Sequence, residues 1–180
     1  SDVFINADGH KKSISAPGPG NYITMAKAVA AARAIVGDES VRERSFIQAH
    51  GSSTPANRIT ESRIFDEVAK VYGIEQWPVS AVKAYVGHSL APASGEQLVA
   101  SLGVFKHGLI PGIKSIDRVA EDVFDDRLNI STSDIDKGIG NVDVAFLNSK
   151  GFGGNNATAT VLSPQVAERM LAKRYGPEKM

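Results

Sequence analysis

Short strand-forming runs alternate with helical stretches along most of this chain. Each run gathers β-branched and aromatic residues, and a longer segment with apolar or alanine-rich helical spacing follows the first three of them. The order that this pattern predicts is β-α-β-α-β-α-β-β. The strands are expected at residues 3–7, 45–49, 77–82, 142–148 and 157–162, with a brief one at 129–131, and the helices at 22–36, 60–72 and 95–107.

Such alternation carries the chain from one strand to a parallel neighbour through a helix. It therefore predicts an α/β fold with a mixed, mostly parallel sheet and helices on both faces. A glycine-rich loop joins the last two strands, which predicts a terminal antiparallel hairpin at an edge of the sheet. Residues 8–20, rich in Lys, Ser, Pro and Gly, are expected to form a loop. Ser163 and Pro164 predict a short surface helix, so we divide the chain into a domain at 1–162 and an extension at 163–180.

The helical segments also predict where each helix ends and which side chains face the core. Gly37 is expected to end the first helix, and Thr60 to cap the second. The core-facing residues expected from the spacing are Ile64, Phe65, Val68, Val71 and Tyr72 in the second helix, and Leu98, Val99, Leu102 and Phe105 in the third.

The composition excludes several classes of protein. The 180 residues contain no cysteine, which excludes disulfides, Cys-based metal sites and a thiol nucleophile carried by this chain. Twenty basic and twenty acidic residues cancel, so the chain has no global field for nucleic acid or anionic lipid. No stretch approaches the roughly 18 apolar residues of a spanning helix, and the first residues do not resemble a signal peptide. We therefore expect a cytoplasmic protein that binds neither membrane nor nucleic acid.

Three loops that follow strands carry the unusual residues of this sequence. Residues 50–55 read His-Gly-Ser-Ser-Thr-Pro, and residues 83–88 read Lys-Ala-Tyr-Val-Gly-His. Within the hairpin, residues 148–156 read Asn-Ser-Lys-Gly-Phe-Gly-Gly-Asn-Asn. Because loops at the carboxyl ends of parallel strands gather at one edge of a sheet, we expect all three to line one pocket.

His50, His88 and Lys83, together with a glycine-rich ribbon, suit the stabilisation of negative charge. Neutral imidazoles donate hydrogen bonds to a carbonyl oxygen that is gaining charge, and glycine lets backbone N–H groups approach an oxyanion closely. Such a set suits enolate and tetrahedral-intermediate chemistry at a thioester. It lacks a nucleophile of its own.

Each piece also has a simpler interpretation. A single His at a strand end is most often structural, a single Lys is most often solvated, and residues 151–154 could be a tight turn rather than an anion or nucleotide site. Ser52, Ser53 and Thr54 could supply a hydrolase nucleophile, but no G-x-S-x-G elbow surrounds them. His50 and His88 could bind a metal ion, but no third ligand has a plausible spacing. We expect no metal and no cofactor.

Taken together, the three loops resemble the carboxyl-terminal half of the β-ketoacyl-[acyl-carrier-protein] synthases, condensing enzymes of thiolase-like fold. The family motifs H-G-T-x-T-P, K-x-x-x-G-H and N-S-x-G-F-G-G-x-N appear here in that order, within a resemblance that runs from about residue 2 to residue 162. The resemblance implies a thiolase-like half-fold. It also implies decarboxylative Claisen condensation of malonyl-carrier protein with an enzyme-bound acyl group, in fatty-acid or polyketide chain elongation.

The resemblance further implies a role for each motif residue. His50 and His88 match the histidines that hold the malonyl thioester carbonyl and stabilise the enolate, and Lys83 matches the lysine that organises them. Phe152 matches the aromatic residue whose N–H completes the oxyanion hole and whose ring gates the acyl pocket. The other residues that the resemblance implies are Gly151, Gly153 and Gly154 for the bend of that loop, Ser52, Ser53 and Thr54 beside the phosphopantetheine arm, and Asn148 with Glu96 or Gln97 in support.

The chain departs from the family pattern at a few positions. Asn57-Arg58 stands where the family commonly has Gly-Asp, and Lys150 replaces a usual phenylalanine beside the gating loop. The family glutamate that pairs with the lysine falls by counting on Gln97, with Glu96 adjacent. The sequence does not decide which of the two faces Lys83.

The half of the family enzyme that carries the cysteine nucleophile and most of the dimer interface is not in this sequence. We expect a fragment whose partners are that amino-terminal half, the acyl carrier protein with its phosphopantetheine-linked thioester and, in the full enzyme, a second copy in a homodimer. A large apolar patch is expected where the other half packs. The alternatives are a chain-length-factor-like relative without condensing activity and a non-enzymatic thioester- or carrier-binding module.

Overall fold

A computed structural model describes residues 1–9 and 18–176 of the chain. Most of the loop expected at residues 8–20, and the last residues of the 163–180 extension, lie outside the described residues. No helix in the described part of the chain combines the length and the apolar character needed to cross a lipid bilayer.

The main sheet has six strands and is mixed, as the sequence predicts. Its strands are β1 (Asp2–Ala7), β2 (Ser45–Gln48), β3 (Trp77–Ser80), β5 (Leu128–Asn129), β7 (Val144–Gly151) and β8 (Asn155–Leu162). Their order across the sheet is β1-β8-β7-β2-β3-β5, with parallel pairing from β7 to β5 and antiparallel pairing among β1, β8 and β7. A separate short pair is formed by β4 (Leu109–Ile110) and β6 (Ile135–Asp136), which sequence reasoning did not predict.

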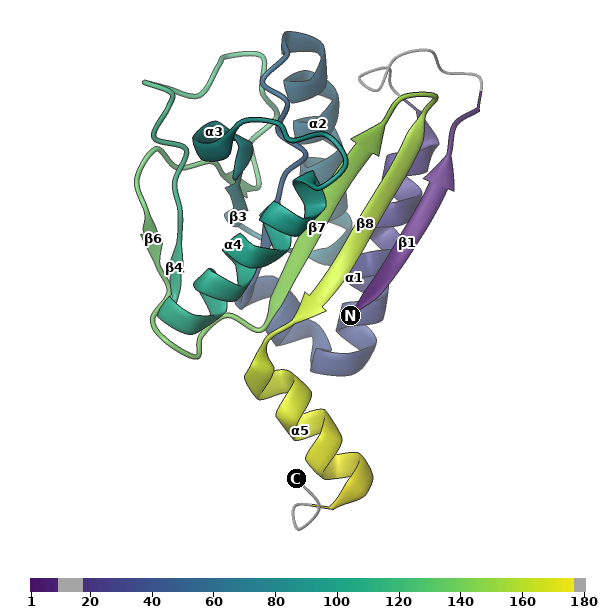
Figure 1. The fold of residues 1–180 in the computed structure, drawn as a ribbon, viewed down its shortest axis with the longest axis vertical. Coiled ribbons are helices and arrows are strands. Elements are labelled where there is room, and N and C mark those ends of the chain that lie inside the picture. The colour runs from purple at the N-terminus through teal and green to yellow at the C-terminus, as the bar shows by residue number, and fades with distance from the viewer. Residues whose placement is uncertain (10–17, 177–180) are drawn as a thin grey trace.

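The hairpin of β7 and β8 was expected at an edge of the sheet, and this placement is wrong. The hairpin lies inside the sheet because β1 pairs along its whole length with the free side of β8, from Asp2 opposite Thr160 to Ala7 opposite Asn155. The antiparallel edge strand is therefore β1, the first segment of the chain (Figure 1).

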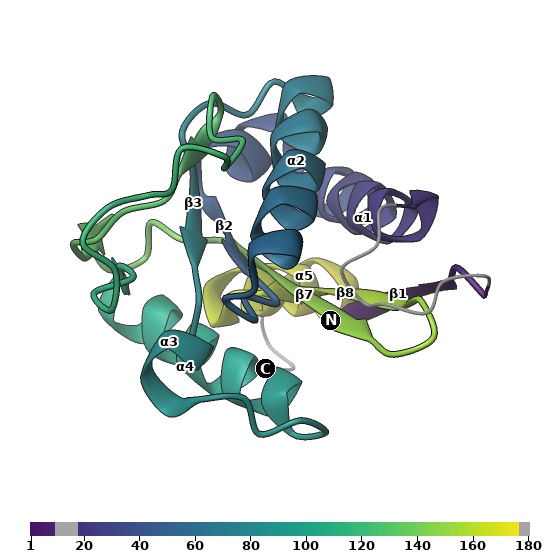
Figure 2. The same cartoon turned by 90° about the horizontal axis from the view of Figure 1, so that it is seen from above.

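Helices cover the two faces of the sheet in pairs. Helices α1 (Pro19–Glu43) and α2 (Pro55–Tyr72) lie on one face, and α3 (Lys83–Val86) and α4 (Ala93–His107) lie on the other (Figure 2). Two buried clusters match this division. Trp77 and Phe146 pack edge to face at 5.6 Å on the α1–α2 side, and Phe46 and Phe105 pack at 6.4 Å on the α4 side.

Two predicted helix boundaries are wrong. Thr60 does not cap α2: the helix begins at Pro55, with Thr54 in the N-cap position. Proline suits the first helical position because its missing N–H has no partner there anyway, and this signal outweighs the capping signal of Thr60. Gly37 has a positive φ of 86°, but its ψ of 172° is not the left-handed helical conformation expected at a helix end, and helical residues resume after this kink and continue to Glu43.

The predicted inward faces of α2 and α4 are only partly correct. Val71 on α2 is 78% exposed, and Leu98, Val99 and Leu102 on α4 are 40%, 70% and 49% exposed. The residues of α4 that face the sheet are Gln97, Ser101, Val104 and Phe105, at the i, i+4, i+7 and i+8 positions of one stripe. A second apolar stripe, formed by Leu98, Val99 and Leu102, therefore points away from this domain.

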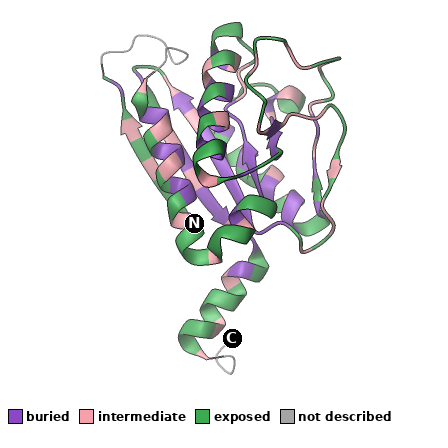
Figure 3. Cartoon of the chain, turned by 180° about the vertical axis from the view of Figure 1, so that it is seen from behind, coloured by how far each residue is buried: buried purple, intermediate pink, exposed green. Residues whose placement is uncertain are grey.

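The extension forms helix α5 (Pro164–Tyr175), which projects from the body of the domain (Figure 1). The Ser163 side chain accepts a hydrogen bond from the Val166 amide, so the predicted N-cap is confirmed. Val166 is buried, whereas most of the helix is exposed along its length (Figure 3).

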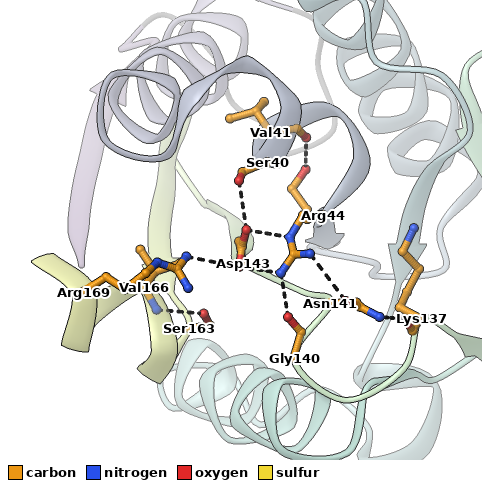
Figure 4. A network of polar contacts seen from close by, with 11 residues as sticks. Ser40, Val41, Arg44, Lys137, Gly140, Asn141, Asp143, Ser163, Val166 and Arg169 are labelled. Atoms are coloured by element: carbon orange, nitrogen blue, oxygen red, sulfur yellow. Dashed lines mark hydrogen bonds and ion pairs between the residues drawn. The ribbon is translucent and has the colours of Figure 1, made fainter.

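A buried carboxylate connects the base of α5 to the end of α1. Asp143 is 3% exposed and accepts hydrogen bonds from Ser40 and from the Arg44 guanidinium, with Nε of Arg44 at 2.7 Å (Figure 4). Arg44 also donates to the Gly140 carbonyl, and Arg169 of α5 approaches Asp143 at 3.8 Å. The pKa of Arg44 is raised by its hydrogen bond to Asp143.

This network predicts an uneven cost for removing two aspartates. Asp143→Ala leaves the half-buried Arg44 without its partner, so we expect the free energy of unfolding to fall by about 2–3 kcal/mol, below the full cost of a fully buried pair. Asp38→Ala removes an exposed ion pair with Arg33. Because the Asp38 and Arg33 side chains are 48% and 53% exposed, this substitution should lower the free energy of unfolding by less than about 1 kcal/mol. Urea unfolding measures both, and equal losses would contradict the structural role of Asp143.

Candidate active site

His50 lies just beyond the end of β2 and is 3% exposed. Its Nδ1 accepts a hydrogen bond from the Lys150 amide at 3.2 Å, so in the neutral ring the proton resides on Nε2. That Nε2 is buried and has no hydrogen-bond partner among the described residues. A buried donor in this state is available for a ligand oxygen.

His88 lies beside His50 although 38 positions separate them in the sequence. The two imidazole centroids are 5.4 Å apart, and the ring planes meet at 83°. The Leu90 amide donates to Nδ1 of His88 at 3.1 Å, which again leaves Nε2 as the protonated nitrogen of the neutral ring. Both predicted histidines are therefore brought together as potential Nε2–H donors.

Both rings line one cavity of about 260 Å³ on the α4 side of the sheet. The cavity is also lined by Ile5 of β1, Ser94 of α4 and Gly151 at the end of β7. Each of the three predicted loops thus contributes to this cavity: the first through His50, the second through His88 and the third through Gly151 and its neighbours. No group of three or more acidic, His or Cys side chains in the described part of the chain is placed to hold a metal ion.

Lys83 is the first residue of α3 and is 8% exposed. Its Nζ donates to the backbone carbonyl of His50, so the lysine fixes the backbone from which the imidazole projects. Burial lowers the pKa of Lys83, and the charges of Glu61 and Glu96 oppose this shift.

Gln97 and Glu96 have different surroundings in the structure. Gln97 is fully buried, and its Nε2 donates to the carbonyls of Ala49 at 2.8 Å and Asn148 at 3.1 Å. Its amide thus ties α4 to the ends of β2 and β7. Glu96 is, after Glu61, the second acidic group whose charge acts on Lys83.

The centre of the polar network is Glu61 of α2, which sequence reasoning missed. Glu61 is 4% exposed, and its carboxylate accepts from the amides of His50 at 2.7 Å and Gly51 at 3.0 Å. It also accepts from the side chains of Asn57 at 2.9 Å and Asn148 at 2.7 Å. The sequence signal for it is an acidic residue three positions before Ile64, at helical spacing from the apolar stripe of the same helix.

Asn148 is fully buried on β7 and links this network to helix α1. Besides Glu61, its side chain bonds with Asn21 at 2.7 Å and with Thr158 at 3.2 Å. Its predicted place beside the site is therefore supported by geometry.

The glycine-rich turn between β7 and β8 contains Phe152, whose side chain is 79% exposed. Gly153 and Gly154 have φ of 77° and 75°. A side chain at Gly154 would also collide with the Asp8 carbonyl, at 2.3 Å from the position of Cβ. Glycine is thus required at Gly154 on two grounds. Gly151 and Asn155, on either side of this turn, line the histidine cavity, whereas Phe152 does not.

Ser52, Ser53 and Thr54 form the turn that leads into α2. None of them lines the histidine cavity, and Ser53 instead lines a second hollow of about 330 Å³ on the opposite face of the sheet. Ser53 has a left-handed φ of 61°, and the hydroxyls of Ser52 and Thr54 lie 3.4 Å apart. These residues are close in sequence to His50 but do not share its cavity.

The electrostatics of the site keep His50 neutral. Burial lowers its pKa to about 4, and the charges of Lys83, His88 and Lys150 act in the same direction, while Glu61 opposes them. At neutral pH the ring is therefore an uncharged Nε2–H donor. Such a donor stabilises a developing oxyanion without first giving up its proton.

Comparison with known proteins agrees with this geometry. The family described as beta-ketoacyl synthase, C-terminal domain, matches residues 1–117. The chain is 65% identical over 178 residues to the beta-ketoacyl-[acyl-carrier-protein] synthase FabY of Pseudomonas aeruginosa. The aligned region covers 98% of this chain and 28% of that protein. It is 34% identical over 113 residues to 3-oxoacyl-[acyl-carrier-protein] synthase 1 of Escherichia coli K12, covering 63% of this chain and 26% of that protein.

A solved structure gives the same result. The crystal structure of the ketosynthase FabY from P. aeruginosa superposes with a TM-score of 0.93 at 64% identity, over 98% of this chain and 28% of that one. The chain thus spans roughly a quarter of the length of these relatives, and its match lies in the carboxyl-terminal part of FabY. With both histidines, the lysine and the glycine turn in place, this chain belongs to the β-ketoacyl synthase family, whose carboxyl-terminal domain it represents.

Proposed function

We propose that this chain supplies the decarboxylation side of the active site of a β-ketoacyl-[acyl-carrier-protein] synthase. The observation that supports this most directly is the pair of imidazoles in one cavity, each with Nδ1 occupied by a backbone amide and Nε2 left as donor. Two such donors suit a carbonyl oxygen that becomes an enolate oxygen. The proposed substrate is a malonyl thioester on the phosphopantetheine arm of an acyl carrier protein.

In the proposed reaction, the bond between the malonyl α-carbon and its carboxylate breaks, and carbon dioxide leaves. The electron pair passes to the α-carbon and the thioester oxygen, where Nε2–H of His50 and of His88 stabilise the enolate. The α-carbon then attacks an acyl thioester held on a cysteine outside this chain. This attack forms the new carbon–carbon bond and turns the carbonyl oxygen into a tetrahedral oxyanion. Collapse of this intermediate restores the carbonyl, breaks the carbon–sulfur bond and releases the cysteine thiolate.

The remaining motif residues have proposed roles around this step. Phe152 donates its amide to the tetrahedral oxyanion while its exposed ring covers the acyl chain, and Gly151, Gly153 and Gly154 permit that turn. Lys83, Glu96, Gln97 and Asn148 position the histidine-bearing loops. Ser52, Ser53 and Thr54 lie outside the cavity, and their proposed contact with the pantetheine arm rests on the family resemblance alone.

The proposed partners are the acyl carrier protein and the amino-terminal half of the synthase, in a cytoplasmic homodimer. Five exposed apolar side chains support a missing neighbour. We call them the exposed apolar face, and they are Val3 and Ile5 of β1 and Leu98, Val99 and Leu102 of α4. Phe4 packs into the core on the α1 side, so its neighbours Val3 and Ile5 point to the α4 side of the sheet.

Replacing either histidine tests the proposed chemistry. In the full-length synthase, His50→Ala and His88→Ala should each lower malonyl decarboxylation by about 10²–10³-fold, the typical cost of one oxyanion donor. Carrier-protein binding should remain. His107→Ala, at the exposed end of α4, is the matched control and should retain full activity.

The same assay separates the alternatives. Unchanged turnover in both histidine variants would contradict the proposal and favour a non-enzymatic carrier-binding module. Decarboxylation without condensation in the wild-type protein would favour a chain-length-factor-like relative.

The exposed apolar face makes a second prediction. Val99→Asp should lower the free energy of unfolding of the full-length synthase by about 3 kcal/mol, because it places an unpaired charge in an apolar contact. Val71→Asp introduces the same change on α2, at a site that is 78% exposed on the opposite side of the sheet, and should cost little. Thermal denaturation compares the two, and equal midpoints would show that α4 is not covered in the full protein.

A further inference from the structure

Lys150 is, besides Lys83, a second buried lysine at the site. It belongs to β7, is 8% exposed and lines the histidine cavity. Its backbone amide donates to Nδ1 of His50 at 3.2 Å, and its Nζ donates to Oδ1 of Asn57 at 3.4 Å. A lysine side chain is rarely this buried unless its amine is paired.

The contact with Asn57 connects Lys150 to the centre of the polar network. Asn57 is 1% exposed, and its Nδ2 donates to Oε2 of Glu61 at 2.9 Å. Glu61 in turn accepts from the backbone amides of His50 and Gly51. The Lys150 side chain thus reaches the backbone of His50 through Asn57 and Glu61, while its own amide contacts the imidazole directly.

The two residues in this contact are both positions where the sequence departs from the pattern it resembles. Asn57 stands at a usual glycine, and Lys150 at a usual phenylalanine. They are 93 positions apart in the chain, yet their side chains meet. An apolar side chain at position 150 would leave Oδ1 of Asn57 without this donor in a buried environment.

We propose that Lys150 is a positioning residue that, with Asn57, holds His50 as a neutral Nε2–H donor and fixes the loop that carries it. This inference rests on the proposed function, because the donor role of His50 belongs to that proposal. Lys150 does not act on the substrate directly; it acts through His50.

The charges around His50 distinguish this role from simple space filling. The groups that face it are Glu61 from α2, Lys83 from α3, His88 from the following loop and Lys150 from β7, while Glu96 of α4 acts on Lys83. Removing the Lys150 charge leaves Glu61 less opposed, so the pKa of His50 rises. Because activity requires the neutral ring, the acid limb of the rate profile then moves to higher pH.

The test uses the full-length synthase and three lysine variants. Lys150→Met keeps the length of the side chain without its charge, Lys150→Arg keeps the charge, and Lys70→Met removes an exposed lysine of α2 as control. We expect Lys150→Met to move the acid limb of malonyl decarboxylation upward by a few tenths of a pH unit, about what one partly screened charge contributes, with KM for the malonyl carrier protein changed less than about twofold. Lys150→Arg and Lys70→Met should keep the wild-type limb.

An acid limb that stays in place in Lys150→Met would overturn the proposal. If that variant does not fold, Asn57→Ala provides the second test, since it keeps the lysine charge but removes its acceptor. It should lower kcat by about tenfold at unchanged KM, and wild-type kinetics would overturn the proposal.

A readout independent of turnover separates this proposal from the proposed function. NMR titration of the His50 imidazole in the full-length protein should show a higher pKa in Lys150→Met than in wild type, and an unchanged pKa would overturn the proposal. If the His50 pKa rises in Lys150→Met as expected but the wild-type enzyme does not decarboxylate the malonyl thioester, only the proposed function is contradicted.

Discussion

The carboxylate of Glu61 connects the polar interior of this domain. It accepts hydrogen bonds from two backbone amides of the His50 loop and from two buried asparagines, one on its own helix and one on β7. A buried carboxylate is costly unless such donors surround it, and here they come from elements far apart in the sequence. The position of His50 therefore depends on α2, β2 and β7 being docked together.

The two faces of the sheet have different functions. On the α1–α2 side, the larger apolar core cluster lies beside the buried polar network around Glu61, which joins α1, α2 and β7. On the α4 side, Gln97 and Ser101 face the sheet, and the Gln97 amide bonds to backbone carbonyls at the ends of β2 and β7. The α1–α2 side thus holds most of the core and the network that fixes the His50 loop, while the α4 side forms the cavity and leaves an apolar surface for a neighbour.

Much of this arrangement could be predicted from local pattern. The strand–helix alternation predicts the mixed sheet, Ser163 and Pro164 predict α5, and the three loops predict a shared site. The failures have physical causes. The sequence mispredicts the start of α2 because a proline such as Pro55 is compatible both with a loop and with the first position of a helix. It mispredicts Leu98, Val99 and Leu102 as core residues because spacing reveals an apolar face but not what covers it.

The sequence by itself determined the kinds of chemistry at the site, since the identities and spacing of His50, Lys83, His88 and the glycine turn are local properties of three loops. Only the tertiary structure decided which nitrogen of each imidazole is free to donate, that the Gln97 amide bonds to backbone carbonyls at the ends of β2 and β7, and that Asn57 meets Lys150. The reason is that hydrogen-bond partners and local charges come from residues up to a hundred positions away, which are brought close only by the docking of helices on the sheet.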